Sequence, residues 1–293
     1  MAVTEPTWAP DSWRRRIAGQ QPEWPDRTAL AAAGERLRVL PPLVFAGEVR
    51  ALQSALAEAA EGRAFLLQAG DCVESFRDVQ TIPIREKLKV FLQMSAVLTF
   101  GAALPVVKVS RIAGQFAKPR SSPTERIGEI EIPSFRGHIV HSDEATAAAR
   151  EPDAARIVEA YFQAASTLNL LRALTKGGFA DITQVHTWNR EFVASSPEGR
   201  RYEQLAHEIG HALAFMQACG IDLADERSLH EVDVYTSHEA LLLDYEEPLV
   251  RKDPLTGEWY ALSAHLLWAG ERTRELDGAH VEFLSGVHNP IGV

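Results

Sequence analysis

The chain has 293 residues, 46% of them hydrophobic, which is enough to bury a full core in one large α/β domain or two smaller ones. Its net charge of -10 argues against nucleic acid as the main partner, because a phosphate backbone requires a broad basic surface. The sequence contains neither the apolar core of a signal peptide nor a run of about 18 apolar residues, so we expect a cytoplasmic protein that does not enter a membrane.

The first part of the chain is irregular in composition. Residues 1–45 are rich in Pro, Trp and Arg and contain the breaker stretches "QQPEW" and "LPPLV". We therefore expect an N-terminal extension with short helices over residues 1–60, followed by the main domain over residues 61–293.

Helical and apolar segments then alternate along the chain. Helical spacing of apolar residues predicts helices over residues 48–62, 85–102, 154–178 and 202–220. Short apolar runs predict buried strands within residues 64–71, 104–110, 179–185, 229–237 and 263–271. Such alternation implies parallel strands, in either an open doubly wound sheet or a (β/α)8 barrel. No G-x-G-x-x-G motif follows the first run, which disfavours the nucleotide-binding form of the open sheet.

The segment "KVSRIAGQFAKPRS" is strongly basic and follows the second predicted strand. Both folds place their active sites at the carboxyl ends of the strands, where Arg111 is positioned to grip a phosphate or carboxylate with two hydrogen bonds. Pro119 fixes the backbone, while Arg120 and Ser121 supply donors for another phosphate. A solvated basic loop is the simpler alternative. A second cationic cluster, at Arg272, leads us to expect a doubly anionic small ligand or two ligands.

The two cysteines match neither a disulfide framework nor a four-cysteine zinc site. Cys72 follows Gly-Asp at the end of a predicted strand. A lone cysteine is commonly a buried small hydrophobic residue, but this position favours a metal ligand, because a bound metal stabilises a thiolate that neighbouring acids disfavour. Cys219 most simply packs in the core.

A competing signal lies in the stretch "LAHEIGHAL". His207, Glu208 and His211 form the H-E-x-x-H arrangement of zinc metallopeptidases on a predicted helix, and Glu231 lies downstream as a possible third ligand. The helix, however, lies between the third and fourth predicted strands. It would cover the outside of an alternating fold, away from the strand ends where the cationic residues gather.

Nearly the whole chain resembles the class II family of 3-deoxy-D-arabino-heptulosonate 7-phosphate (DAHP) synthases. The matching stretches are "QQPEWPD", "PPLVFAGEV", "FLLQAGDCVESF", "LQMSAVLTFGAALPVVKVSRIAGQFAKPRS", "LNLLRALT", "HTWNREF", "SHEALLLDYE" and "SAHLLWAGERTRELDGAHVEFLSGVHNPIGV". The basic segment and "GERTRELDGAHVEF" are far more specific than an isolated H-E-x-x-H motif.

The resemblance implies a fold and a reaction. The expected fold is a (β/α)8 barrel, represented here by roughly its first five to six β/α units after an N-terminal extension. The expected reaction condenses phosphoenolpyruvate with erythrose 4-phosphate and releases phosphate, the first step of the shikimate pathway to aromatic amino acids. The resemblance also implies a divalent metal, Mn²⁺ or Co²⁺, and a homo-oligomer in the full-length family.

The family's motifs also imply roles for individual residues. Cys72 matches the metal-binding cysteine. No catalytic residue is assigned. The residues that bind phosphoenolpyruvate in the family correspond to Arg111, Lys118, Glu271 and Arg272. Those that bind erythrose 4-phosphate correspond to Pro119, Arg120 and Ser121.

The sequence departs from the family pattern in three respects. The family continues beyond "NPIGV" with a lysine, an arginine and three further metal ligands. The family's "YRGDxVNG" is replaced by "FRGHIVHS" over residues 135–142, and its "HDWN" by "HTWN" over residues 186–189. These differences leave open an incomplete record of an active enzyme, a divergent paralogue of an aminoshikimate type, and a non-catalytic partner subunit.

Overall fold

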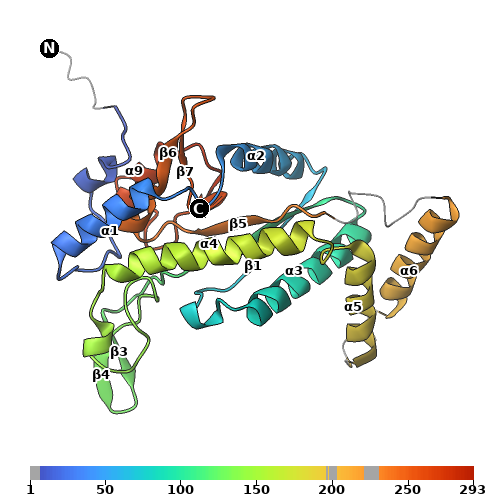
Figure 1. The fold of residues 1–293 in the computed structure, drawn as a ribbon, viewed down its shortest axis with the longest axis horizontal. Helices are drawn as coiled ribbons and strands as arrows, with labels where there is room; N and C mark the ends of the chain where they lie inside the picture. Colours follow the sequence, from blue (N-terminus) through green and yellow to red (C-terminus); the bar gives the residue numbers. More distant parts are fainter. Residues whose placement is uncertain (1–6, 196, 198–202, 221–230) are drawn as a thin grey trace.

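A parallel sheet forms the centre of the structure, a computed structural model that describes residues 7–195, 197, 203–220 and 231–293 (Figure 1). Its order is β1-β2-β5-β8-β9, and every neighbouring pair is parallel. The strands are β1 (Phe65–Gly70), β2 (Val106–Arg111), β5 (Tyr235–Glu239), β8 (Leu266–Trp268) and β9 (Ile291–Gly292). Gly70 pairs with Arg111, so β1 and β2 end side by side.

Helices supply most of the remaining structure. The longer ones are α1 (Arg27–Val39), α2 (Ala46–Ala60), α3 (Thr81–Ala102), α4 (Ala155–Lys176), α5 (Ile182–Ser195) and α6 (Glu203–Ala218). The shorter ones are η1 (Ser12–Arg15), η2 (Phe76–Asp78), η3 (Ala148–Arg150), α8 (Leu243–Glu246), η5 (Glu247–Leu249) and α9 (Ala279–Ser285). Helices α2, α3, α4 and α6 fall within a few residues of the predicted ranges, because each has apolar residues at helical spacing.

The largest core cluster joins helices from distant parts of the chain. Figure 1 shows α4 running across the middle of the molecule, with α1 near one end and α3 beside it. Ile157 and Leu168 of α4 are buried together with Leu37 of α1 and Leu88 of α3. The buried positions of α4 recur every three or four residues and so form one continuous apolar face.

Two antiparallel hairpins complete the fold. The hairpin of β3 (Thr124–Ile127) and β4 (Ile130–Pro133) follows the basic segment. The hairpin of β6 (Val250–Lys252) and β7 (Trp259–Ala261) lies between β5 and β8 in the chain.

The third predicted strand is wrong. Most of residues 179–185 belong to α5, which begins at Ile182. The side chain of Asp181 accepts hydrogen bonds from the backbone N–H groups of Thr183 and Gln184, which stabilises the first turn of a helix. Val185 and Trp188 are buried at helical spacing, so the apolar run is part of a longer helical pattern. The fifth strand of the sheet is instead β9, from the stretch "NPIGV".

The parallel sheet and its helices are compatible with part of a (β/α)8 barrel. The predicted domain boundary at residues 60 and 61 stays a prediction, although α2 contacts both β1 and β2. Among the described helices, none is long and apolar enough to cross a membrane.

Candidate functional site at the strand ends

The ends of β1 and β2 bring Cys72 and Arg111 together. Gly70 has a φ of +147°, and a Cβ atom there would lie 2.5 Å from the carbonyl oxygen of Arg111, so only glycine fits this close approach. The chain then turns over the end of β2, where Arg111 Nη2 donates a hydrogen bond to the backbone oxygen of Cys72 at 3.3 Å. The Cys72 side chain is exposed.

Arg111 presents an unused donor at this edge of the sheet. Its guanidinium carbon lies 4.7 Å from the ring centroid of Trp268, the last residue of β8. Its Nε atom is buried and has no hydrogen-bond partner among the described residues. A buried donor without a partner is costly, and an anionic ligand would satisfy it.

Glu239, the last residue of β5, faces the same cationic groups. The carboxyl group is buried, and its Oε1 has no hydrogen-bond partner among the residues that the structure describes. Burial raises the pKa of Glu239, and the positive charges of Arg111 and Arg272 oppose this rise. A Cβ atom at Gly270 would lie 2.2 Å from Glu239 Oε1, so the absence of a side chain at Gly270 makes room for the carboxylate. The fourth predicted strand, within residues 229–237, ends two positions before Glu239; this proximity was the available signal in the sequence.

The loop after β2 is shaped around the buried carboxylate of Glu74. The backbone N–H groups of Ala113, Gly114 and Gln115 all donate to it, at 2.7–2.9 Å. Burial raises the pKa of Glu74, while these three hydrogen bonds lower it. Gln115 in turn accepts a hydrogen bond from the backbone N–H of Glu239 at 2.9 Å. The loop is therefore fixed to both β1 and β5 before it reaches the "KPRS" stretch.

The "KPRS" stretch meets the end of β8. Arg272 Nη2 donates a hydrogen bond to Ser121 Oγ. The backbone N–H of Lys118 donates to the carbonyl oxygen of Arg136 at 2.8 Å. Arg120 Nη2 lies 2.5 Å from Glu125 Oε2 on β3. These contacts place the predicted erythrose 4-phosphate residues next to one of the predicted phosphoenolpyruvate residues.

Glu271 is oriented differently from the other predicted site residues. Its exposed carboxylate pairs with Arg274, whose Nε and Nη2 atoms donate at 2.8 and 3.0 Å. The hydrogen bond and the charge of Arg274 lower the pKa of Glu271. The structure thus brings four predicted residues together with Glu239: Cys72, Arg111, Arg272 and Ser121. Glu271 instead pairs with Arg274, three positions later in the chain.

Comparison with known proteins establishes the family. The model of the class-II DAHP synthetase family matches residues 8–293. The chain belongs to this family. It is 54% identical over 292 residues to the phospho-2-dehydro-3-deoxyheptonate aldolase of Streptomyces coelicolor. It is 48% identical over 288 residues to the phospho-2-dehydro-3-deoxyheptonate aldolase AroG of Mycolicibacterium smegmatis.

The two relatives are longer than this chain. The matches cover 100% and 97% of this chain but 64% and 61% of the relatives from Streptomyces coelicolor and Mycolicibacterium smegmatis, respectively. The recognition of the class II DAHP synthase family from the sequence is therefore confirmed, over almost the whole length of the chain.

DAHP synthases of this family generally depend on a divalent metal, and the described residues do not form a site for one. Among them, no group of three or more His, Cys, Asp or Glu side chains is arranged to hold a metal ion. Cys72 alone offers a single soft ligand, which is insufficient for a stable site.

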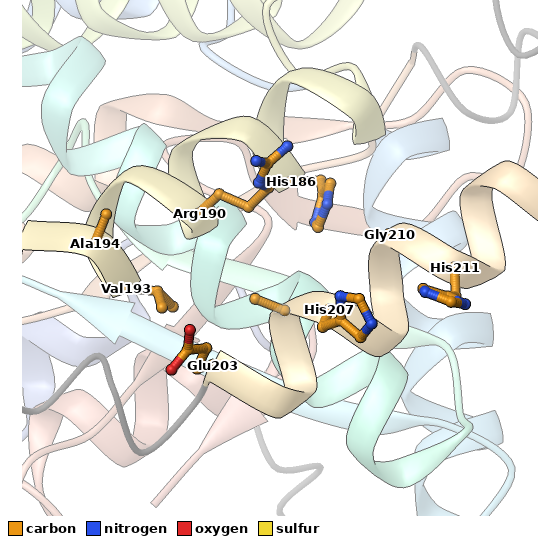
Figure 2. A pocket seen from close by; sticks show the side chains of 9 residues that line it. His186, Arg190, Val193, Ala194, Glu203, His207, Gly210 and His211 are labelled. Carbon is orange, nitrogen blue, oxygen red and sulfur yellow. The ribbon is translucent and has the colours of Figure 1, made fainter.

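The H-E-x-x-H stretch of this DAHP synthase family member lies away from the strand ends. It belongs to α6, which stands beside α5 at one end of the molecule in Figure 1. Figure 2 shows His207 and His211 on α6, along a groove of about 650 Å³ that His186 of α5 also lines. Glu231, the suggested third ligand, lies 3.5 Å from Lys176 Nζ. Membership of the class-II DAHP synthetase family argues against the peptidase alternative.

The expectation that Cys219 packs in the core is wrong. Cys219 follows α6 and its side chain is exposed, not packed in the core. The reason is the position of α6, which packs mainly on α5 and leaves the end of the helix uncovered.

Proposed function

We propose that the chain acts as a DAHP synthase, which condenses phosphoenolpyruvate with erythrose 4-phosphate and releases phosphate at the entry to the shikimate pathway. The observation that carries the proposal is the buried Nε of Arg111, which has no hydrogen-bond partner in the described part of the chain and lies near Glu239 and Arg272. Family membership and the names of the relatives support it.

In this proposal, two different sets of residues bind the two substrates. Arg111, Lys118 and Arg272, with Glu271, bind phosphoenolpyruvate, while Pro119, Arg120 and Ser121 bind erythrose 4-phosphate. Two phosphorylated substrates repel one another, so fixed guanidinium groups are needed to hold them at reacting distance. The hydrogen bond from Arg272 to Ser121 supports adjacent binding of the two substrates.

Glu239 is suited to a proton transfer within this arrangement. Its buried carboxyl group has a raised pKa and faces two guanidinium groups. The condensation joins C3 of phosphoenolpyruvate, an enol phosphate, to the aldehyde carbon of erythrose 4-phosphate. Water adds to C2, phosphate leaves from there, and the former aldehyde oxygen gains a proton. Glu239 lies at the edge of the sheet where this proton is needed.

The complete fold, the metal, the oligomeric state and the location are also part of the proposal. We propose a complete (β/α)8 barrel for the active form and Mn²⁺ or Co²⁺ as the metal, with Cys72 as one ligand. A homo-oligomer is supported by exposed apolar side chains on neighbouring helices, such as Val90 and Met94 on α3. A cytoplasmic location fits substrates whose phosphate groups prevent free passage across membranes.

The experiment measures binding and turnover on the chain as it stands. Calorimetry with phosphoenolpyruvate is expected to show binding that weakens as salt is raised, because charge-assisted hydrogen bonds drive it. Phosphate release is then followed with both substrates and Mn²⁺. Binding without turnover would favour the non-catalytic partner subunit. Absence of binding by either substrate would overturn the proposal.

A further inference from the structure

Gln20 lies in the segment before α1, residues 7–26, which we call the N-terminal arm. Its side chain forms two hydrogen bonds with the backbone of Arg120. The backbone N–H of Arg120 donates to Gln20 Oε1 at 2.8 Å, and Gln20 Nε2 donates to the Arg120 carbonyl oxygen at 3.0 Å. One side-chain amide therefore satisfies both backbone polar groups of one residue, as a neighbouring strand would. The two residues are 100 positions apart in the chain.

The backbone of Gln20 contacts Arg136, which follows β4. Its carbonyl oxygen accepts a hydrogen bond from Arg136 Nη1 at 3.2 Å. The carbonyl oxygen of Arg136 accepts from the backbone N–H of Lys118 at 2.8 Å. Gln20 has a φ of +63°, a left-handed conformation that is uncommon outside glycine and is kept where surrounding contacts enforce it. Lys118 and Arg120 are thus both connected to one residue of the arm.

The next residue makes a matching contact with a second loop. Gln21 Nε2 donates to the carbonyl oxygen of Leu241 at 2.7 Å, and its Oε1 accepts from the backbone N–H of Leu243 at 3.1 Å. This loop directly follows Glu239 at the end of β5. The two consecutive glutamines therefore fasten two different loops of the candidate site to the arm.

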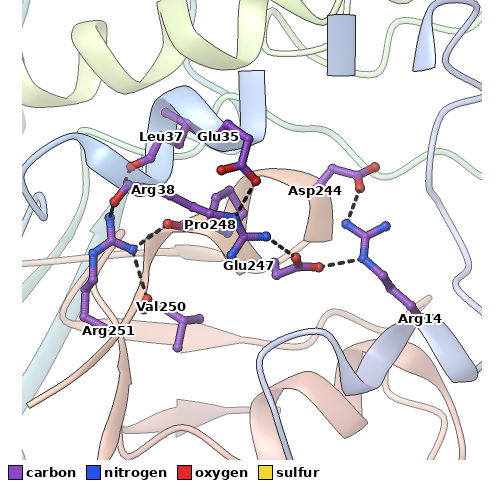
Figure 3. A network of polar contacts seen from close by, with 9 residues as sticks. All are labelled: Arg14, Glu35, Leu37, Arg38, Asp244, Glu247, Pro248, Val250 and Arg251. Atoms are coloured by element: carbon purple, nitrogen blue, oxygen red, sulfur yellow. Dashed lines mark hydrogen bonds and ion pairs between the residues drawn. The ribbon is translucent and has the colours of Figure 1, made fainter. Parts of the chain in front are cut away.

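The arm itself is firmly attached to the rest of the fold. Arg14 forms ion pairs with the buried carboxylates of Asp244 and Glu247, at 3.3 and 2.8 Å (Figure 3). The indole N–H groups of Trp13 and Trp24 donate to Glu247 and Asp244, at 2.9 and 3.0 Å. Anchors on both sides of Gln20 give it a fixed position from which to hold Arg120.

We propose that Gln20 is a positioning residue, through which the N-terminal arm sets the "KPRS" loop in the geometry that binds the phosphate of erythrose 4-phosphate. The inference rests on the proposed function. It assigns Gln20 no contact with substrate: the side chain acts on the Arg120 backbone, and the guanidinium then acts on the ligand. The region expected to be an irregular extension thereby becomes part of the site.

The first test needs no substrate. Residue-level hydrogen exchange of the full chain compares Gln20→Ala with the wild type. Loss of the acceptor is expected to speed exchange of the Arg120 amide about tenfold or more. Gln20→Gly, which suits the left-handed backbone, is expected to do the same and separates the side chain from backbone strain. Unchanged amides in α4 establish that the fold persists. Arg120 protection that is unaltered in both variants would overturn the inference.

Gln21→Ala is the matched control. It is expected to speed exchange of the Leu243 amide while leaving Arg120 unchanged, because each glutamine serves its own loop. Equal effects of Gln20→Ala and Gln21→Ala on Arg120 would mean a general loosening of the arm and would also overturn the inference.

The second test separates the two substrates by calorimetry. Gln20→Ala is expected to weaken erythrose 4-phosphate binding about tenfold and to change phosphoenolpyruvate binding less than twofold. Equal weakening of both ligands would contradict a specific role for Gln20. A wild-type chain that binds neither ligand would overturn the proposed function, whereas the exchange experiment would still decide whether Gln20 holds Arg120.

Discussion

Arg272 and Ser121 are 151 residues apart in the chain and are joined by a hydrogen bond from Arg272 Nη2 to Ser121 Oγ. Arg272 follows β8, and Ser121 closes the "KPRS" loop after β2. The bond couples the two groups of cations to which we assign different substrates. Orientation of one group therefore depends on the other.

Ser121→Ala is expected to weaken erythrose 4-phosphate binding about fivefold, since a hydrogen bond to a charged group typically contributes on the order of 1 kcal/mol or more. Ser122→Ala is the matched control, because among the described residues Ser122 Oγ accepts a hydrogen bond only from the backbone N–H of Thr124, at 3.4 Å. Calorimetry measures both. Comparable losses in the two variants would contradict a specific role for Ser121.

Arg111→Lys is expected to weaken phosphoenolpyruvate binding by at least about tenfold. Lysine lacks the planar fork and cannot reproduce the stacking on Trp268, whose ring centroid lies 4.7 Å from the guanidinium carbon. Arg126→Lys, on the exposed β3–β4 hairpin, serves as the control and should bind normally. Unaltered affinity in Arg111→Lys, measured at low and high salt, would remove Arg111 from the site.

Glu247→Gln tests how strongly the N-terminal arm is held. The buried carboxylate accepts hydrogen bonds from Trp13, Arg14 and Arg38 at 2.7–2.9 Å, and Figure 3 shows those from Arg14 and Arg38. In the variant, the amide N–H₂ group would face one of these donors. We expect a loss of about 2 kcal/mol in the free energy of unfolding, measured with urea. Glu35→Gln is the control. Its exposed carboxylate lies 3.4 Å from Arg38, and its replacement should cost less than about 0.5 kcal/mol.

Glu48 gives the stability a defined pH dependence. Burial raises its pKa. His265, whose Nε2 lies 3.8 Å away, the hydrogen bond from the Phe45 N–H and the charge of Arg172 together outweigh burial and lower the pKa from 4.5 to about 2. The ionised Glu48 carboxylate therefore makes its full contribution to the free energy of unfolding above pH 4.5. This contribution is lost as the pH falls towards 2.

The matching variant is Glu48→Gln. Because the carboxylate is partly exposed, we expect it to cost only about 1 kcal/mol at pH 7. Urea unfolding at several pH values should show the gap to wild type closing between pH 4.5 and about 2. Glu129→Gln, at a highly exposed position, should show no such trend. A gap that stays constant with pH would contradict the lowered pKa.

Replacing His207 and His211 together with Ala is expected to leave bound metal unchanged. The two rings lie 4.4 Å apart on α6, and the described residues offer no third ligand that completes a metal-holding group. Elemental analysis after dialysis against Zn²⁺ measures the content of both proteins. Loss of one equivalent of zinc in the double variant would revive the peptidase alternative.

The family, the helices α2, α3, α4 and α6, and the strands β1, β2 and β8 could all be predicted from the sequence. Each of these depends on local information: apolar residues at a regular period, or motifs such as "GERTRELDGAHVEF" that are specific over a short stretch. The segment at residues 179–185 misled because a short apolar run has the same composition in a buried strand and at the start of a helix. Only Asp181, which caps α5, distinguishes the two.

Tertiary structure alone decided the contacts that make the candidate site. Glu239 acquires its raised pKa from burial, and it fits because Gly270, two residues after β8, leaves space for it. Gln20 reaches Arg120 because the arm is anchored to residues more than 200 positions later in the chain, such as Glu247. Periodicity and motif spacing report only on neighbours in sequence. Burial, charge and hydrogen bonding at these positions come from residues that folding alone brings together.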